Sequence, residues 1–509
     1  MLDLTPILNL YAAYRGQQLR LEDPVLRQER ELLLLLGAAR HTRFGRDHGF
    51  ESLRSVAEFQ ARVPLRRYED FWRDYWEADF PRLTDCTWPG SLPYFALTSG
   101  TTTGVTKYIP CSHEMNGANV KAAADILVHH LAARPDSRLL AGRNFVLGGS
   151  TDLRSLAPGV LAGDLSGIAA KTTPWWARLR YFPPRELETI VDWEVKIERL
   201  AAASFDADIR SISGTPSWML LFFDKLAELR PGRGRRLRSF YPDLELVIHG
   251  AVNFAPYRKI FGELLADSDA ETREVYAASE GFVGVADRGD GEGLRLITDN
   301  GLFFEFVPLE ELDAPAPTRH WLKDVELGVN YALVVTSCAG LWSYVIGDTL
   351  RFIERAPPRI LITGRTSYTL SAFGEHLIDE EIETAVAAAA GAIDAAVVDY
   401  SVGALVPELS GELGQHLYVV EFAEAPPGGA AVEAFARTLD AELSATNEDY
   451  EAHRAGGYGL KPPQVHAVPS GRFAAWMKSR GQLGGQHKVP RIITDPELFR
   501  HLRDFMGSG

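Results

Sequence analysis

Short apolar runs separated by helical segments constrain the fold of this chain most. Five runs have the length of buried strands and lie at residues 144–149, 244–250, 273–279, 302–309 and 331–337. Helical patterns occur before and between them, at residues 24–61, 114–133 and 216–229. Because strands mixed with helices are typical of a sheet covered by helices, we predict an α/β fold.

A change in composition after residue 355 predicts a second domain. Residues 356–376 contain a Pro-Pro pair and a Gly-Arg turn. Beyond them we expect helices at 378–390 and 430–445, strands at 395–400 and 416–422, a surface loop at 425–429 and a polar tail. Since 509 residues exceed one compact core, we predict a large domain over 1–362, a hinge at 363–370 and a small α+β domain over 371–509.

Composition narrows the functional classes. The formal net charge is −15 and 46% of the residues are hydrophobic, which is typical of a globular protein and argues against nucleic-acid or anionic-membrane binding. Cys86, Cys111 and Cys338 show no paired spacing, which favours free thiols in a reducing compartment. Neither a signal-peptide pattern nor a bilayer-spanning apolar run is present, so we expect a cytoplasmic protein.

The motif with the clearest chemistry is a hydroxyl-rich loop after residues 94–97. It consists of Thr98, Ser99, Gly100, Thr101, Thr102, Thr103 and Gly104, and Lys107 closes it. Hydroxyls and backbone N–H groups in a glycine-rich turn form a concave set of donors for polyphosphate oxygens, and a lysine adds positive charge. The spacing is not that of a Walker A loop. The structural alternative is a Ser/Thr-rich surface turn.

Two further clusters follow predicted strands. In the first, Gly250, Ala251, Val252 and Asn253 permit the close approach of a flat base at the carboxyl end of a strand. In the second, residues 276–281, Tyr276 is suited to stack on a base and Glu280 to hold Mg²⁺ against phosphate. The alternatives are a plain strand-to-turn segment and a helix N-terminus with an acidic first turn.

Three charged residues complete the set. Asp348 follows Gly347 and is placed to accept the hydroxyls of a ribose. Arg365 lies at the predicted hinge, where it can contact phosphate in one domain orientation. Lys488 follows a glycine pair that would allow a long reach. The alternatives are a turn-capping aspartate and a basic solvated tail.

In this order the motifs resemble those of the adenylate-forming superfamily of acyl-CoA synthetases, luciferases and adenylation domains. They resemble more closely the GH3 acyl acid–amido synthetases, and among these the bacterial members. The matching segments are VPLRRYEDFWRDY (63–75), GTPSWM (214–219), HGAVNFAPY (249–257), YAASEG (276–281) and YVIGDTLRF (344–352). Two others, ATNEDYEAHR (445–454) and GGQHKVPR (484–491), resemble a GH3 C-terminal signature that the wider superfamily lacks. The resemblance covers nearly the whole chain.

The resemblance implies an adenylate-forming enzyme fold, with mixed sheets flanked by helices and a small mobile C-terminal domain. It implies that residues 98–103 and Lys107 hold the β- and γ-phosphates of ATP. Residues 249–254 and Tyr276 would line the adenine site, with Ala278, Ser279 and Arg365 also in the ATP site. It further implies that Asp348 binds the ribose, that Glu280 binds Mg²⁺, and that Lys488 reaches the α-phosphate and the acyl carboxylate, so that Glu280 and Lys488 serve catalysis.

The implied reaction is ATP-dependent adenylation of a carboxylic acid to an acyl-AMP, with Mg²⁺, followed by transfer to an amine such as an amino acid. It releases pyrophosphate and AMP. Because two anions must meet, catalysis would be charge neutralisation and alignment. Two alternatives stay open: a ligase forming thioesters with CoA or a carrier protein, and a non-catalytic protein that binds nucleotide or acyl acid. We expect a monomer with small-molecule partners, acting without nucleic acid or membrane.

The acyl substrate is less constrained. The resemblance places its pocket near residues 114–133, 172–180 and 214–219. Trp175, Trp176, Trp218 and Phe282 suggest an aromatic or apolar acid, although large aromatic residues more often form core. Arg178 or Arg180 is a candidate for fixing a carboxylate. Plant members carry a lysine near the hinge, where this chain has Glu375 and His376. Plant hormone specificity is therefore not transferred.

Overall fold

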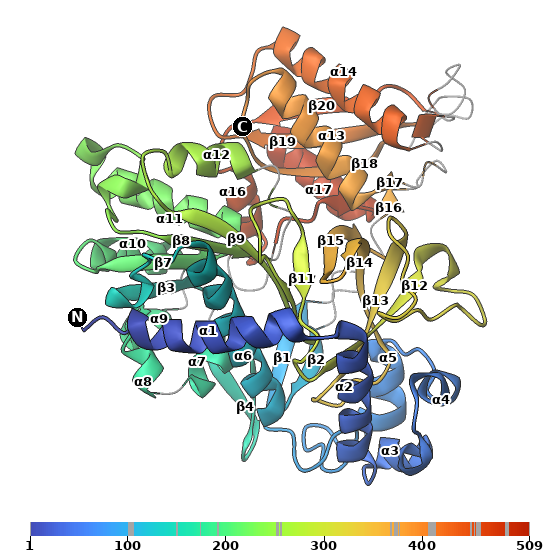
Figure 1. Cartoon of the computed structure of the whole chain (residues 1–509). Helices are drawn as coiled ribbons and strands as arrows, with labels where there is room; N and C mark the ends of the chain where they lie inside the picture. The colour runs from blue at the N-terminus through green and yellow to red at the C-terminus, as the bar shows by residue number, and fades with distance from the viewer. Residues whose placement is uncertain are drawn as a thin grey trace. The chain divides into compact units, whose positions relative to one another are not determined.

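The computed structural model forms two compact units (Figure 1). The N-terminal unit comprises Met1–Val252 and Asp267–Leu361, and the C-terminal unit comprises Asn253–Ala266 and Ile362–Gly509. The structure describes residues 2–99, 106–148, 151–173, 175–190, 193–250, 254, 257–366, 369–370, 375, 377–405, 414–447, 450–451, 454, 460–483 and 488–507.

A mixed sheet forms the centre of the N-terminal unit. Its strands, in spatial order, are β12 (Leu302–Pro308), β13 (Asn330–Ser337), β14 (Tyr344–Arg355), β15 (Pro358–Arg365), β11 (Leu294–Leu296), β10 (Gly281–Val285), β9 (Glu271–Ala278), β8 (Leu246–Gly250), β7 (Ile209–Gly214), β3 (Arg143–Leu147) and β6 (Tyr181–Phe182). Pairing is parallel from β6 to β9, whereas β10 is antiparallel to β9 and β11, and β13 to β12 and β14. The α/β prediction and the five predicted strands, found as β3, β8, β9, β12 and β13, are confirmed.

A second sheet and most of the helices surround this centre. The second sheet has the order β2 (Thr106–Cys111), β1 (Tyr94–Ser99), β5 (Val160–Gly163) and β4 (Leu153–Ala157). The helices are α1 (Thr5–Leu21), α2 (Pro24–Ala39), α3 (Arg43–Asp47), α4 (Val56–Arg62), α5 (Tyr68–Phe71), α6 (His113–Ala133), α7 (Leu165–Thr172), α8 (Trp175–Arg178), α9 (Arg185–Glu188), α10 (Trp193–Ser204) and α11 (Pro216–Leu229). The helices predicted at 114–133 and 216–229 are confirmed as α6 and α11.

The helical prediction for residues 24–61 is confirmed for most of the segment, which is divided into separate helices. Three α-helices and a 3-10 helix at Phe50–Ser52 occupy it, and local caps explain the breaks. Thr42 Oγ1 accepts a hydrogen bond from the Gly45 backbone N–H and begins α3. Ser55 Oγ accepts one from Glu58 and begins α4. Between them Gly49 has a φ of 65°, a left-handed conformation that ends a helix. Hydroxyl side chains compete for backbone donors, so they interrupt a periodic apolar pattern.

A buried ion-pair cluster joins three parts of the N-terminal unit that are distant in sequence. The guanidinium of Arg15 on α1 lies 2.7 Å from a carboxylate oxygen of Asp125 on α6 and 2.7 Å from one of Asp299, between β11 and β12. Lys121 Nζ lies 2.6 Å from Asp299 Oδ2. Burial alone would raise the pKa of Asp299, but hydrogen bonds from Arg15 and Lys121 lower it to about 2. The carboxylate therefore stays ionised at neutral pH.

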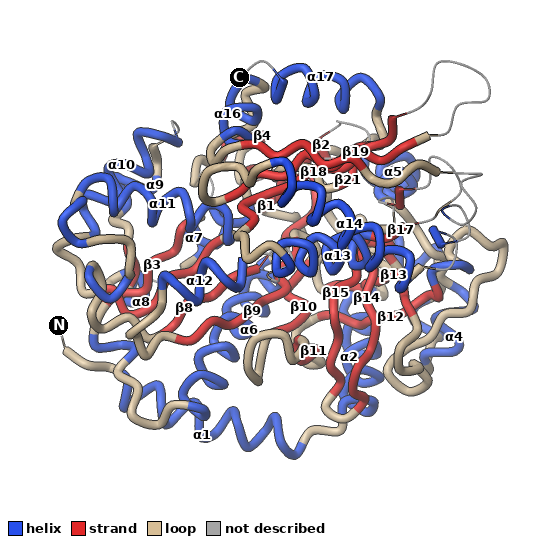
Figure 2. The backbone as a smooth tube through the Cα atoms, turned by 90° about the horizontal axis from the view of Figure 1, so that it is seen from above, coloured by secondary structure: helices blue, strands red, loops and turns tan. Residues whose placement is uncertain are grey.

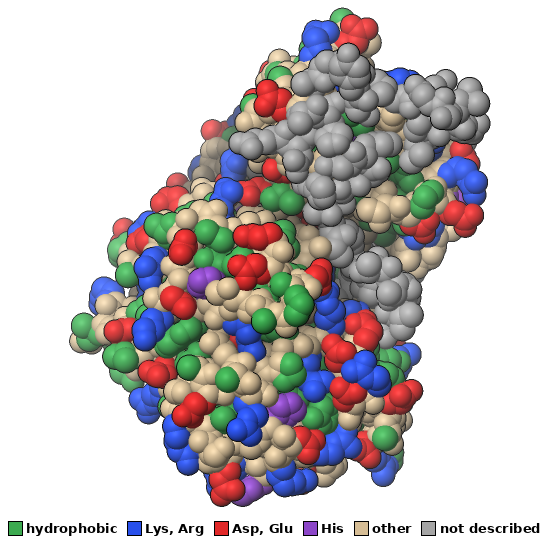
Figure 3. Space-filling view, turned by 90° about the vertical axis from the view of Figure 1, so that its right-hand side faces the viewer, with side chains coloured by type: hydrophobic (Ala, Val, Ile, Leu, Met, Phe, Trp, Pro, Cys, Tyr) green, Lys and Arg blue, Asp and Glu red, His purple; other side chains and the backbone are tan. Residues whose placement is uncertain are grey.

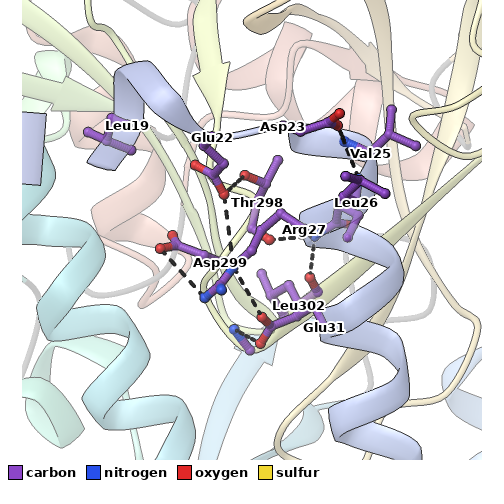
Figure 4. Close-up of polar contacts among 12 residues, drawn as sticks. Leu19, Glu22, Asp23, Val25, Leu26, Arg27, Glu31, Thr298, Asp299 and Leu302 are labelled. Atoms are coloured by element: carbon purple, nitrogen blue, oxygen red, sulfur yellow. Dashed lines mark hydrogen bonds and ion pairs between the residues drawn. The ribbon is translucent and has the colours of Figure 1, made fainter. Parts of the chain in front are cut away.

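The start of α2 extends this cluster (Figure 4). Arg27 lies between Glu22, Glu31 and Asp299, at 3.9 to 4.0 Å from a carboxylate oxygen of each. Asp23 Oδ1 caps α2 by accepting from the Val25 and Leu26 backbone N–H groups. The β11–β12 connection is thus held between α1, α2 and α6.

The C-terminal unit is a sheet covered by helices on both faces. Its strands are β20 (Gln464–Val468), β19 (Gln415–Phe422), β18 (Val397–Leu405) and β21 (Ile492–Ile493), with a separate pair β16 (Thr369–Leu370) and β17 (Leu377–Ile378). Its helices are α12 (Arg258–Leu264), α13 (Asp379–Ala392), α14 (Gly429–Thr446), α16 (Arg472–Ser479) and α17 (Pro496–Gly507). The predicted strand pair and the two predicted helices are confirmed as β18, β19, α13 and α14.

Alternation along β19 produces the two cores of this unit. Tyr418 and Val420 face α13 and α14, which lie side by side in Figure 2, whereas Leu417 and Val419 pack against α16 and α17. The polar tail predicted after residue 446 is therefore wrong. Scattered apolar residues of that tail, including Trp476, build the second core. Their spacing is too irregular to be recognised without the sheet that they cover.

The charged side chains of the described residues form no predominantly basic face in the view of Figure 3. Acidic and basic side chains are intermixed over the face in Figure 3. Among the described helices, none combines the length and the apolar character that crossing a membrane requires.

The ion-pair cluster predicts a large stability loss when Arg15 is replaced. Arg15→Met should lower the free energy of unfolding by about 3–5 kcal/mol, because Asp125 and Asp299 would remain buried with less compensation. Urea unfolding followed by tryptophan fluorescence measures it. Arg20→Met on the exposed face of α1 is the matched control and should change stability by less than about 0.5 kcal/mol. Equal losses in both variants would contradict the role of the cluster.

Candidate functional site

The hydroxyl-rich motif runs in sequence from β1 to β2, two antiparallel strands of the N-terminal unit. In the register of β1 and β2, Thr98 pairs with Lys107 and Ser99 with Thr106. The first two residues of the motif, Thr98 and Ser99, thus end β1. Gly100, Thr101, Thr102 and Thr103, together with the Ser99 side chain, lie outside the described residues.

Lys107 is positioned by residues that the motif analysis did not single out. Its Nζ lies 3.5 Å from Glu69 Oε1 and 5.3 Å from the centre of the Tyr68 ring. The Tyr68 hydroxyl also accepts a hydrogen bond from the Tyr108 backbone N–H. Segment 63–75 therefore contacts the strand that follows the hydroxyl-rich loop. In the sequence, segment 63–75 was recognised only by its resemblance to a GH3 segment. Nothing in it indicated a contact with Lys107.

Gly250 ends β8 at a very close backbone approach. A Cβ atom there would lie 2.3 Å from the Val275 carbonyl oxygen, so any larger residue would displace β9. Val275 is its partner in the parallel ladder and directly precedes Tyr276. Gly250 and Tyr276 are thus neighbours near the carboxyl ends of β8 and β9. Ala251, Val252 and Asn253 lie outside the described residues.

Tyr276 and Asp348 meet although they belong to separate motifs. The Tyr276 hydroxyl donates a hydrogen bond to Asp348 Oδ2. Three strands separate β9 from β14 in the sheet order, a separation of roughly 19 Å in a flat sheet. The sheet therefore curves and brings the two strands together. Tyr276 was expected to stack on a base, and the structure adds that its hydroxyl orients the carboxylate.

Glu280 lies in the tight turn between β9 and β10. Ala278 pairs with Gly281, so Ser279 and Glu280 form a two-residue hairpin connection, and the alternative of a helix N-terminus is wrong. Glu280 is only 9% exposed. Burial raises the pKa of the Cys111 thiol to about 12, and the charge of Glu280 adds to the increase. The Glu280 carboxylate therefore lies near β2, the strand that follows the hydroxyl-rich loop.

A Mg²⁺ ion would have to be shared with a ligand at this place. Among the described residues, no group of three His, Cys, Asp or Glu side chains could hold a metal. A single buried carboxylate is nevertheless a fitting partner for Mg²⁺, which binds proteins through one or two carboxylates and takes its other ligands from phosphates and water. The donor set thus fits a metal that arrives with ATP.

Arg365 and Lys488 belong to the C-terminal unit. Arg365 ends β15 next to Gly364, where a Cβ atom would lie 2.6 Å from that of Asp379, so the strand end touches the start of α13. Lys488 is exposed and directly precedes Val489, which packs on the α16–α17 core. Glu375 is fully buried, with Oε1 2.7 Å from His416 Nε2, and so forms part of the core. His376 lies outside the described residues.

The aromatic residues suggested for the acyl pocket differ in their surroundings. Trp175 is 76% exposed. The Trp176 side chain lies outside the described part of the chain, and Trp218 on α11 is half-buried. Phe282 packs against Ala122 and Ile126 of α6. The arginines suggested for a carboxylate make internal contacts: Arg178 with Glu188 and the Ala170 carbonyl, and Arg180 with the Leu2 carbonyl.

The chain is similar in sequence to rice proteins. It is 31% identical over 242 residues to the indole-3-acetic acid-amido synthetase GH3.8 of Oryza sativa subsp. indica. This match covers 44% of this chain and 39% of the relative. The chain is 30% identical over 247 residues to the probable indole-3-acetic acid-amido synthetase GH3.9 of subsp. japonica, with coverage of 44% and 54%. The matches thus span about half or less of the length of these relatives.

Solved structures share the fold. AtGH3.15 acyl acid amido synthetase in complex with 2,4-DB superimposes with a TM-score of 0.81 at 19% identity, covering 97% of this chain and 95% of that one. A 2-hydroxyisobutyryl-CoA ligase in the postadenylation state gives a TM-score of 0.61 at 18% identity, with coverage of 94% and 91%. The predicted adenylate-forming enzyme fold, with its smaller C-terminal part, is confirmed.

Three models of one family match successive parts of the chain. The GH3 family N-terminal domain matches residues 17–142, the central domain residues 295–365 and the C-terminal domain residues 380–497. Together they account for more than half of the sequence, in the order that the motifs predicted. This chain belongs to the GH3 family.

Proposed function

We propose that this protein is an ATP-dependent ligase that adenylates a carboxylic acid and transfers the acyl group to an amine, for which an amino acid is the expected class. The hydrogen bond from Tyr276 to Asp348 is the observation that carries the proposal, because it joins two of the ATP motifs. Gly250 beside β9 and Glu280 near β2 support it. The named rice relatives join an acid to an amine, and this chemistry is the part carried over.

Each residue has a distinct task in the proposed adenylation. The loop at 98–103 binds the β- and γ-phosphates, with Lys107 neutralising charge after exchanging its contact with Glu69. Asp348, oriented by Tyr276, accepts the ribose hydroxyls. Lys488 neutralises the approaching acyl carboxylate and the α-phosphate. Alignment and charge neutralisation of two anions suffice for this chemistry, so no covalent protein nucleophile is required.

Glu280 would hold Mg²⁺ beside the phosphates. When bound, the ion supplies charge neutralisation on the transferred phosphate oxygens. The buried position of Glu280 strengthens this interaction, because a low local dielectric increases the attraction between carboxylate and cation.

The proposal includes a moving C-terminal domain. Residues 1–362 would bind ATP and the acid, 363–370 would serve as the hinge, and 371–509 would carry Lys488 to the phosphates. Residues 253–266 of the first range belong to the C-terminal unit and would move with it. The left-handed Gly364, with a φ of 139°, supplies a position that few other residues adopt. We further propose a reducing cytoplasm, because the three cysteines are buried free thiols. A monomer remains the expected state.

Pyrophosphate release tests the function directly. The enzyme is incubated with Mg·ATP and a panel of aromatic and aliphatic acids, each alone, with a mixture of amino acids and amines, or with CoA. Release that requires an acid and increases with an amine is the expected result. An increase with CoA alone would instead indicate a thioester ligase. Binding of ATP without release for every acid would favour a non-catalytic protein.

Lys488→Ala should lower the rate of pyrophosphate release by roughly 10²–10³-fold, the loss typical of removing one charge-stabilising donor. The fold should remain intact, because the Lys488 side chain is exposed. Stopped-flow pyrophosphate detection measures the rate. Lys461→Ala removes another exposed lysine of the same unit and should keep the wild-type rate. If Lys488→Ala behaves like this control, the assigned role of Lys488 is wrong.

Asp348→Ala should raise the KM for ATP by about 10–100-fold, the loss expected for hydrogen bonds to a charged acceptor. Tyr276→Phe should produce a smaller increase, because it removes only the hydrogen bond that orients the carboxylate. Initial rates against ATP concentration provide both values. An unchanged KM for ATP in Asp348→Ala would exclude the assignment of Asp348 to the ribose. If the KM changes in Asp348→Ala but not in Tyr276→Phe, Tyr276 does not orient the carboxylate.

A further inference from the structure

Arg491, three residues after Lys488, makes a set of contacts that the reaction described above does not use. Its guanidinium is largely buried, with 11% of the side chain exposed. Nη1 lies 2.7 Å from Asp399 Oδ1, and Asp399 is itself nearly buried. Nη2 donates to the Tyr257 hydroxyl at 3.0 Å. The guanidinium carbon lies 4.4 Å from the centre of the Tyr400 ring.

Only an arginine can make these three contacts together. Its planar group pairs with a carboxylate, donates to a hydroxyl and stacks on an aromatic face at the same time. A lysine presents one compact charge and would lose the stacking and one of the two polar partners. A buried charge that is matched in this way keeps its neighbours in one arrangement, because any other would leave it uncompensated.

The backbone around Arg491 is attached to the same strand. Ser401 Oγ donates to the Pro490 carbonyl at 2.7 Å, and the Val402 N–H donates to the Arg491 carbonyl at 2.7 Å. The next residues form β21, which pairs in parallel with β18. These attachments lie within five residues of the exposed Lys488 along the chain.

Tyr257 gives this anchor a second connection. It belongs to the C-terminal unit and is 1% exposed. It also ends the HGAVNFAPY segment, only seven residues beyond Gly250 at the end of β8. The guanidinium of Arg491 therefore joins the start of α12 to the chain that presents Lys488, within one unit. Lys259 of the following α12 also contacts Asp394 in the same unit.

We propose that Arg491 is the positioning residue of Lys488: through Asp399, Tyr400 and Tyr257 it fixes residues 489–493 on β18, so that the lysine is presented from a rigid base. This inference rests on the catalytic role proposed for Lys488. A rigid base matters because a small displacement of a charge-stabilising group already costs much of its effect on the rate.

The test uses a variant in which both partners of the ion pair lose their charge. Arg491→Met alone would leave Asp399 buried without its partner and risks a failure to fold, whereas Arg491→Met with Asp399→Asn removes both charges. The matched control is Arg454→Met with Asp440→Asn. Arg454 and Asp440 form a two-point ion pair in the same unit, at 2.6 and 2.7 Å.

Hydrogen–deuterium exchange measures the positioning without any substrate. The expected result is at least about ten-fold faster exchange in residues 489–493 of the Arg491/Asp399 variant, because local opening there becomes easier. The Arg454/Asp440 control should keep the wild-type exchange in this segment. Unchanged exchange in the Arg491/Asp399 variant would overturn the proposal.

Kinetics then separate positioning from general stability. With the acid that supports the fastest pyrophosphate release, the Arg491/Asp399 variant should lose about ten-fold in kcat, with the KM for ATP within about two-fold of wild type. Combined with Lys488→Ala it should lose nothing further, because its effect acts through the lysine. Arg491→Lys should retain only part of the wild-type kcat. The Arg454/Asp440 control should retain all of it.

The outcomes distinguish this inference from the proposed function. A multiplicative loss on the Lys488→Ala background, or a normal kcat in the Arg491/Asp399 variant beside a defective Lys488→Ala, would overturn the positioning role alone. Wild-type turnover in Lys488→Ala would overturn both.

Discussion

The parallel pairing of β8 with β9 determines where the candidate site can form. It sets Gly250 against Val275 so closely that no side chain fits between them, and Tyr276 follows as the next residue. The two-residue turn from β9 to β10 contains Glu280 and lies at the same end of these strands. Backbone hydrogen bonds of the sheet thus place residues of two motifs side by side.

Buried charges decide how the remaining elements are oriented around this sheet. Arg15 joins α1, α6 and the β11–β12 connection, and Arg319 pairs with the fully buried Glu305 of β12 at 2.8 Å. Arg491 plays the corresponding part in the C-terminal unit. Desolvation of such groups is costly, and only the complete set of partners offsets it. Each cluster therefore selects one arrangement of elements that apolar contacts alone would leave adjustable.

The C-terminal signature of the family has a structural role in the described residues. Asn447 donates to Glu381, whose carboxylate also accepts from the Ile378 backbone N–H at the start of α13. Arg454 donates two hydrogen bonds to the carboxylate of Asp440 on α14. The signature thus ties the end of α14 to the first turn of α13, just beyond the predicted hinge.

The sequence by itself determined the strands, the helices with clear caps and the chain order of the motifs, because these depend on local periodicity and on residues a few positions apart. It left the breaks in the helical region at 24–61 and the apolar part of the tail unrecognised. Only the tertiary structure decided that Tyr276 orients Asp348, 72 residues away, and that Arg491 meets Tyr257, 234 residues away. Local patterns carry no information about such partners: sheet curvature and the burial of charge select them once distant segments have packed together.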